Sequence, residues 1–327
     1  MTALLLFAKP LWNTPKNNFS PPDGKKKGNI MSKSAQLGRR DSIIVSLSSY
    51  IAATVLCFVS YMRMPEHWEM MPKFMVAAAI ATFFIFIMSY LLKNSSMYDP
   101  FWSVQPMVFG AGLVAAYGIE NVTTHQWITV IGMQLYGLRL TSNFYRDWPG
   151  LSHEDWRYKD LAEKSGKAYW LVSLSGIHFF PTVQVFMGCL PAFYLFAAEN
   201  TGGDSYLILS ILGWVVLYGS VLLAFVADEQ MRNFRRNPEN KGKTMDQGLW
   251  SRNRHPNYLG ECSTWIGLWI LILAYNPSYW WTGCGAIAIL VMFYGVSIPW
   301  MDRRSLERRP GFDEYMKRTG RLFPKLF

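Results

Sequence analysis

The sequence predicts an all-α protein that crosses a membrane several times as a bundle of helices. Of its 327 residues, 51% are hydrophobic and 16% are aromatic. Charged residues make up 17%, whereas soluble domains carry about a quarter, and they cluster between long apolar runs. A bilayer core about 30 Å thick needs roughly twenty apolar helical residues, and eight stretches approach that length.

The first forty residues differ in composition from the rest. They contain several prolines and the run Lys25-Lys26-Lys27, and they lack the apolar residues that a core requires. We therefore expect residues 1–40 to form a disordered cytosolic leader. Residues 41–327 are predicted to form one membrane-embedded helical domain.

Seven or eight spans are expected, because two of the eight apolar stretches are interrupted by polar residues. The stretches are Ile43–Tyr61, Phe74–Leu92, Val104–Ile119, Trp127–Phe144, Tyr169–Ala198, Tyr206–Ala227, Tyr258–Tyr275 and Ser278–Trp300. The third and fourth carry the interruptions. The fifth contains Pro181 and Pro191, and proline kinks a helix, so this stretch is either one bent span or two shorter pieces.

The distribution of Lys and Arg predicts which connections face the cytosol. Residues 146–167, 232–254 and 303–325 are strongly basic, whereas residues 120–126, 199–205 and 276–277 contain no Lys or Arg. The two sets alternate correctly if both chain termini are cytosolic. The first connection, with Arg63 and Lys73, does not fit this pattern.

Composition also argues against other classes of protein. The formal net charge of +10 would suit nucleic acid, but no zinc spacing, RNP-type motif or basic recognition helix accompanies it. The four cysteines lie in apolar stretches without a CxxC pair, so we interpret them as packing residues. Neither a metal site nor a disulfide framework is predicted.

The densest polar pattern runs from Asp228 to Trp265. Asp228, Arg232 and Arg235 recur at i, i+4 and i+7, so they share one helical face just beyond the sixth apolar stretch. Ionisable groups near membrane depth are costly and indicate functional sites. The alternative is a basic loop that only fixes topology.

A second helix is predicted to begin at Pro256, since proline suits the first helical turn. His255 then lies near the N-cap, and Arg252 and Arg254 flank a helix N-terminus that suits a phosphate. Asn257, Glu261 and Trp265 follow at i, i+4 and i+8, on one face directed into the membrane. A carboxylate at the position of Glu261 needs a partner.

Three further segments carry polar groups. Tyr136 and Arg139 lie one helical turn apart within an apolar stretch, although Arg139 could instead reach the cytosolic face. Residues 98–105 place an acid, an indole and an amide at a membrane boundary, where Trp102 could be an interfacial anchor. Residues 153–158 belong to a charged segment that is either an amphipathic surface helix or a cover over a cofactor. His178 could bind either a backbone carbonyl or a ligand.

With these residues in view, the chain resembles the DUF1295 group of the steroid 5-alpha-reductase superfamily. The resemblance rests on a C-terminal signature, on residues 153–158 and on the tail from Arg309 to Tyr315, and it covers roughly residues 98–327. The signature reads Gly248-Leu249-Trp250, Arg254-His255-Pro256-Asn257-Tyr258, Gly260-Glu261 and Trp265-Ile266-Gly267. Membrane methyltransferases resembling isoprenylcysteine carboxyl methyltransferase share the element from Arg254 to Gly260.

The resemblance implies a helical-bundle reductase that binds NADPH from the cytosol and takes a lipid from the bilayer. Its cofactor positions correspond to Asp228, Arg235, Asn257 and Tyr258, and a tyrosine that faces the substrate carbonyl corresponds to Tyr136, paired with Arg139. The steroid reductases also place a glutamate after a Trp-x-x-Gln pattern, and this chain has none after Gln105.

We therefore expect an NADPH-dependent reductase of a carbon–carbon double bond in a lipid or sterol-like substrate. Tyr136 and Arg139 are the predicted catalytic residues. The predicted cofactor-binding residues are Asp228, Arg232, Arg235, Arg252, Arg254, His255, Asn257, Tyr258 and Glu261. An S-adenosylmethionine-dependent membrane methyltransferase and a non-catalytic lipid-binding relative are the alternatives. The membrane is expected to be the endoplasmic reticulum, or the inner membrane if the source is bacterial.

Overall fold

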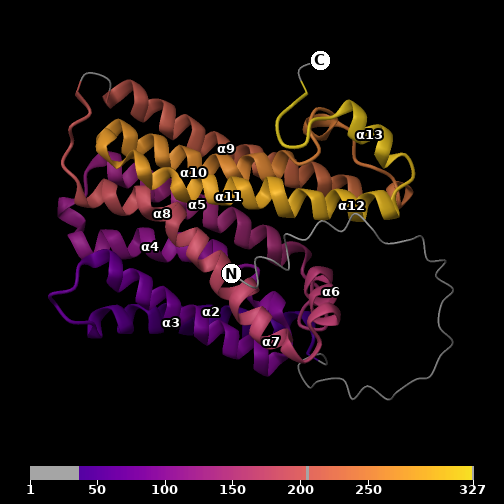
Figure 1. Cartoon of the computed structure of the whole chain (residues 1–327), viewed down its shortest axis with the longest axis horizontal. Coiled ribbons are helices and arrows are strands. Elements are labelled where there is room, and N and C mark those ends of the chain that lie inside the picture. Colours follow the sequence, from indigo (N-terminus) through magenta and orange to yellow (C-terminus); the bar gives the residue numbers. More distant parts are fainter. Residues whose placement is uncertain (1–36, 204–205, 326–327) are drawn as a thin grey trace.

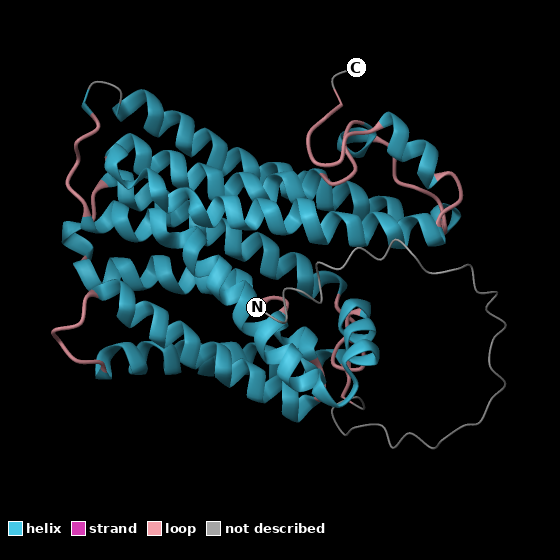
Figure 2. Cartoon of the chain, viewed as in Figure 1, coloured by secondary structure: helices cyan, strands magenta, loops and turns pink. Residues whose placement is uncertain are grey.

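The computed structural model describes residues 37–203 and 206–325, so the predicted leader lies outside the described residues except for its last four positions. The described part consists of helices and connecting loops without a strand (Figure 2). The all-α class is therefore confirmed. One isolated backbone bridge joins Asn253 to Gly320.

The first half of the chain forms four long helices. They are α2 (Arg39–Arg63), α3 (Met70–Leu92), α4 (Phe101–Tyr117) and α5 (Thr124–Asp147), with short 3₁₀ turns η2 (Ser95–Tyr98) and η3 (Ile119–Asn121). The last two residues of the predicted leader, Arg39 and Arg40, belong to the first helix. A capping box of Thr123 and Gln126 starts α5, because the two side chains satisfy backbone donors that a helix N-terminus leaves free.

The predicted fifth span is one bent helical stretch. It consists of α7 (Tyr169–Val172), the π-helical turn η5 (Ser173–Phe179) and α8 (Phe180–Ala197), and it continues from α6 (Trp156–Ser165) and η4 (Gly166–Ala168). The π-turn precedes Pro181, and His178 within it contacts the carbonyl oxygen of Ser173 at 2.9 Å and the hydroxyl of Ser89 at 3.0 Å. His178 thus binds a backbone carbonyl, which was one of its two expected roles.

The second half of the chain carries most of the predicted site. It contains α9 (Tyr206–Arg236), η7 (Pro238–Asn240), η8 (Gly248–Ser251), α10 (Pro256–Tyr275), η9 (Pro277–Gly283), α11 (Cys284–Met292), η10 (Phe293–Ser297), α12 (Ile298–Arg308) and α13 (Phe312–Arg318). At 31 residues, α9 is about 46 Å long. Because the bilayer core is about 30 Å thick, one end of α9 extends beyond it.

Six helical stretches of the described residues are long and apolar enough to cross a membrane. They correspond to the first, second, fifth, sixth, seventh and eighth predicted spans. With 17 residues, α4 is shorter than these stretches, and α5 is more polar, yet both pack within the bundle (Figure 1). Many outward-facing side chains are apolar, such as Ile51 and Val215, as expected of a surface in contact with lipid.

Small residues bring α9 and α10 into close contact. A Cβ atom added to Gly260 would lie 2.7 Å from the carbonyl oxygen of Ser220, and one added to Gly267 would lie 2.8 Å from the backbone nitrogen of Leu217. Small side chains let membrane helices approach closely. This contact places Glu261, the neighbour of Gly260, beside the part of α9 that carries Asp228.

The three basic segments meet at one end of the bundle, where Figure 1 shows α6, the end of α12 and α13. Ion pairs connect the segments: Arg232 pairs with Asp147 at 3.2 Å, and Arg318 pairs with Asp246 at 2.5 Å. The connection between α2 and α3 lies at the opposite end. The shared end of the basic segments agrees with their predicted common side, and its assignment to the cytosol stays a prediction.

Candidate functional site

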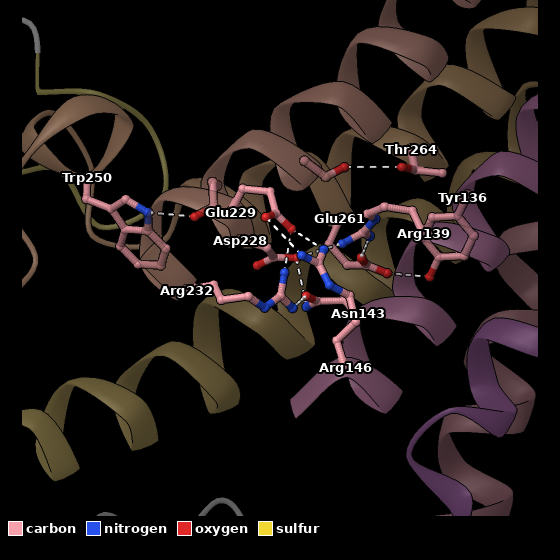
Figure 3. Close-up of polar contacts among 12 residues, drawn as sticks. Tyr136, Arg139, Asn143, Arg146, Asp228, Glu229, Arg232, Trp250, Glu261 and Thr264 are labelled. Atoms are coloured by element: carbon pink, nitrogen blue, oxygen red, sulfur yellow. Dashed lines mark hydrogen bonds and ion pairs between the residues drawn. The ribbon is translucent and has the colours of Figure 1, made fainter. Parts of the chain in front are cut away.

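The centre of the candidate site is a buried ion-pair network among three helices (Figure 3). Arg139 on α5 donates to Glu261 on α10 at 2.8 Å and to Asp228 on α9 at 3.1 Å. The Tyr136 hydroxyl donates to the other carboxylate oxygen of Glu261. The side chains of Arg139 and Glu261 are only 7% and 5% exposed. The partner that Glu261 was predicted to need is therefore a guanidinium together with a phenol.

A second layer of contacts extends the network toward the end of the bundle. Asn143, one helical turn beyond Arg139, donates to Asp228 at 3.0 Å and accepts a hydrogen bond from Arg232. Arg232 also pairs with Glu229 and Asp147. It is buried, and carboxylate and amide oxygens bind its guanidinium. Arg232 thus holds α9 against α5.

Arg254 and His255 bind the C-terminal segment. Arg254 pairs with Asp302 at 3.1 Å and donates to the carbonyl oxygens of Met316 and Thr319. The Nε2 atom of His255 lies 2.9 Å from Asp302. Both side chains are buried, so they fix the ends of α12 and α13 against the start of α10.

These helix ends enclose a cavity of about 250 Å³. Seven of the nine predicted cofactor residues line it: Asp228, Arg232, Arg235, Arg254, His255, Asn257 and Tyr258. Arg252 is exposed and does not line the cavity, and Glu261 lies deeper, in the buried network. The two predicted catalytic residues, Tyr136 and Arg139, also lie outside the cavity lining.

Two arginines in the cavity wall have no acidic partner among the residues that the structure describes. Arg235 is exposed, Arg309 is half-buried, and neither forms an ion pair or a side-chain hydrogen bond within residues 37–203 and 206–325. Burial, together with the positive charge of Arg235, lowers the pKa of Arg309. The buried amide oxygen of Asn257 also has no donor. The wall therefore offers two positive charges and one acceptor to a ligand.

The sequence analysis did not select Arg309, Asn143 or Asp302. Asn143 follows Tyr136 and Arg139 at the helical spacing i+7, and this periodicity could have revealed it. Arg309 belongs to the tail segment noted in the resemblance, but its sequence position gives no sign that it faces Arg235. Asp302 lies 48 residues from Arg254, and no local pattern predicts that contact.

The aromatic and acidic segments at residues 98–105 and 153–158 contact each other, and Trp156 packs against Trp300 of α12. The Tyr158 hydroxyl donates to Asp99, and Arg157 binds Asp155 at 2.8 Å. Burial raises the pKa of Asp99 to about 7, although the positive charge of Arg157 opposes this shift. These contacts tie α6 to the start of α4, and none of these residues lines the cavity.

Comparison with known families identifies the chain. The family described as "Protein of unknown function (DUF1295)" matches residues 85–319, which is more than two thirds of the chain. The chain belongs to the DUF1295 family. It is also similar to an uncharacterized protein of Schizosaccharomyces pombe, at 25% identity over 260 residues that cover 72% of this chain and 74% of the relative. No solved structure matches the chain.

Proposed function

We propose that this DUF1295 protein is a membrane-bound, NADPH-dependent reductase of a carbon–carbon double bond in a lipid or sterol-like substrate. The observation that carries the proposal is the pair of unpartnered arginines, Arg235 and Arg309, in one cavity wall. Two like charges that face one cavity favour an anionic ligand, because an anion between them relieves their repulsion.

The residues fit a nucleotide that carries phosphate groups. Arg235 and Arg309 would hold phosphate oxygens, and the free amide oxygen of Asn257 would accept a hydrogen bond from an amide or hydroxyl group. The cavity, at about 250 Å³, is somewhat smaller than typical ligand pockets of 300–1,000 Å³. It would therefore hold one part of a dinucleotide, and the rest would lie over the basic surface around it.

NADPH would supply the hydride, which is chemistry that side chains do not provide. The protein would orient both reactants and stabilise negative charge on the substrate. Arg139 lies one side chain beyond the cavity, since Asp228 lines the cavity and pairs with Arg139 at 3.1 Å. A fixed guanidinium at this position would stabilise an oxygen that gains negative charge during reduction.

NADPH binding to the detergent-solubilised chain tests the proposal. We expect the substitution Arg235→Gln to weaken NADPH binding by tenfold or more, since a hydrogen bond to a charged group contributes about 1.5–3 kcal/mol. Arg236→Gln is the matched control, because Arg236 is the next residue on α9, is exposed and does not line the cavity. This control should bind NADPH as the unsubstituted protein does.

If binding is measured by the shift in melting temperature that each compound causes, the same experiment distinguishes the other functions. A shift with S-adenosylmethionine and none with NADPH would identify a methyltransferase and reject the reductase. No shift with either compound would indicate a non-catalytic lipid-binding relative. Equal NADPH affinity in Arg235→Gln and Arg236→Gln would remove the assignment of the cavity as the phosphate site.

A further inference from the structure

A groove of about 460 Å³ lies between α5 and α9 on the outside of the ion-pair network. Its walls are formed by residues of α5 from Leu135 to Arg146 and by residues of α9 from Tyr218 to Glu229. Both helices contribute residues at helical spacing over eleven positions, which corresponds to about 16 Å. The groove therefore follows the two helices along their length.

The groove changes from apolar to polar along its length. The apolar end is formed by side chains that are all more than 40% exposed, namely Leu135, Leu138, Leu222 and Phe225. Since α9 is one of the candidate membrane spans, these side chains are expected to face lipid. At the other end lies Arg146, which is paired with Glu229. An apolar strip that joins a charged end matches the two parts of a lipid that lies in the bilayer.

Arg139 lines the groove and carries a buried donor that has no acceptor. The Nη atoms of Arg139 bind Glu261 and Asp228, but its Nε atom has no hydrogen-bond partner among the described residues. The Arg139 side chain is 7% exposed. A buried donor without an acceptor costs about 1–3 kcal/mol, so an oxygen atom of a ligand at this position would be stabilised.

The groove and the proposed nucleotide cavity meet at the same two side chains. Asn143 and Asp228 line both spaces, and they are bonded to each other at 3.0 Å (Figure 3). A ligand that reaches Arg139 from the groove therefore contacts the same two residues as a ligand in the cavity.

We propose that the groove binds a straight-chain lipid with a carbonyl group at its polar end. The chain lies along Leu135, Leu138, Leu222 and Phe225, and the carbonyl oxygen accepts a hydrogen bond from Nε of Arg139. The narrow strip that one face of each helix provides suits a single hydrocarbon chain. The inference rests on the proposed function, because it names the substrate class and its binding site.

The test uses photolabelling of the whole protein in nanodiscs of saturated phosphatidylcholine. The probe is a long-chain α,β-unsaturated methyl ketone with a diazirine in the middle of its chain. We expect labelled peptides from α5 and α9. The ketone should compete about tenfold better than the oxygen-free alkene of the same length, because a hydrogen bond to a charged donor contributes about 1.5–3 kcal/mol. This comparison needs no variant.

Two tryptophan substitutions on α9 form a matched pair. Leu222→Trp fills the groove and should reduce labelling at least fivefold. Leu212→Trp lies on the same helix at similar exposure but outside the groove, and it should leave labelling unchanged. Equal labelling of the two variants, or labelled peptides from other helices, would overturn the groove. Equal competition by ketone and alkene would overturn the role of Arg139.

NADPH titration of the same samples separates this inference from the proposed function. If NADPH binds and the ketone probe does not label α5 or α9, the lipid groove is wrong and the nucleotide cavity stands. If the probe labels the groove and NADPH does not bind, the reductase proposal fails and the lipid site stands.

Discussion

The ion pair at the centre of the site makes a quantitative prediction for the substitution Arg139→Met. This change removes the guanidinium that binds two buried carboxylates, Glu261 at 2.8 Å and Asp228 at 3.1 Å. Removing one partner of a buried pair costs about 3–5 kcal/mol, because the remaining charge is left without compensation. Asp228 keeps its bond from Asn143, so most of the cost falls on Glu261. We expect a loss of about 4 kcal/mol.

The free energy of unfolding can be measured in mixed micelles by titration with dodecyl sulfate, followed by tryptophan fluorescence. Arg303→Met is the matched control, since Arg303 and its partner Glu307 are both 61% exposed. Exposed pairs contribute about 0–1 kcal/mol, so this control should lose little stability. Losses that agree within about 0.5 kcal/mol for the two variants would refute a structural role for the buried pair.

A second substitution tests the physical reason for the loss. Adding Glu261→Gln to Arg139→Met removes the carboxylate that has lost its partner, and the glutamine oxygen can still accept the hydrogen bond from Tyr136. We expect this double variant to recover about 2 kcal/mol of the lost stability. If the second substitution lowers stability further, uncompensated charge is not the cause of the first loss.

Three further predictions follow from the geometry. Asp99→Asn should raise the melting temperature by a few degrees at pH 8 and by progressively less toward pH 4. Burial raises the pKa of Asp99 to about 7, so between pH 4 and pH 7 the native state binds more protons than the unfolded state. The unsubstituted protein therefore loses stability as the pH rises from 4 to 7. A gain that does not change with pH would contradict this reasoning. Gly260→Ala should lower the free energy of unfolding by about 1–3 kcal/mol in the same dodecyl sulfate titration, because its Cβ would lie 2.7 Å from the Ser220 carbonyl oxygen. Gly219→Ala is the control on α9 and should not lower the stability, because its Cβ would meet no atom within 4 Å. Equal effects of the two substitutions would argue against close packing of α9 and α10. Tyr136→Phe removes the hydroxyl that donates to Glu261, the carboxylate that binds Arg139. It should therefore reduce turnover of an enone test lipid about tenfold, while NADPH affinity changes less than twofold because this tyrosine does not line the cavity. Unchanged turnover would contradict the predicted catalytic role of Tyr136.

Much of the helical framework could be predicted because it depends on local sequence. Apolar length predicts where a helix can span a membrane, and helical periodicity predicts which residues share a face. The face of Asp228, Arg232 and Arg235 was predicted in this way, and all three side chains line the same cavity. Pro256 likewise begins α10 as expected.

The contacts between helices could not be predicted from the same signals. Periodicity does not specify how far a helix rotates about its axis or which neighbour it meets. Those choices depend on close contacts such as the one between Gly260 and Ser220, which involve residues 40 positions apart. The sequence analysis therefore assigned Glu261 to the cofactor, whereas its carboxylate binds Arg139 and Tyr136 in this structure. The role of Glu261 toward a cofactor stays a prediction.

The arginines of the site fall into two groups that have different physical functions. Arg232 and Arg254 are paired with carboxylates and are well buried, so each connects parts of the fold; Arg139 is also paired with carboxylates, but its Nε atom has no partner among the described residues. Arg235 and Arg309 have no such partner among the described residues, and the charge of Arg235 acts against that of Arg309. Natural proteins retain such unfavourable features where function requires them. A phosphate-bearing ligand would turn this repulsion into binding energy, which is why the unpaired arginines are a stronger indication of function than the larger number of paired ones.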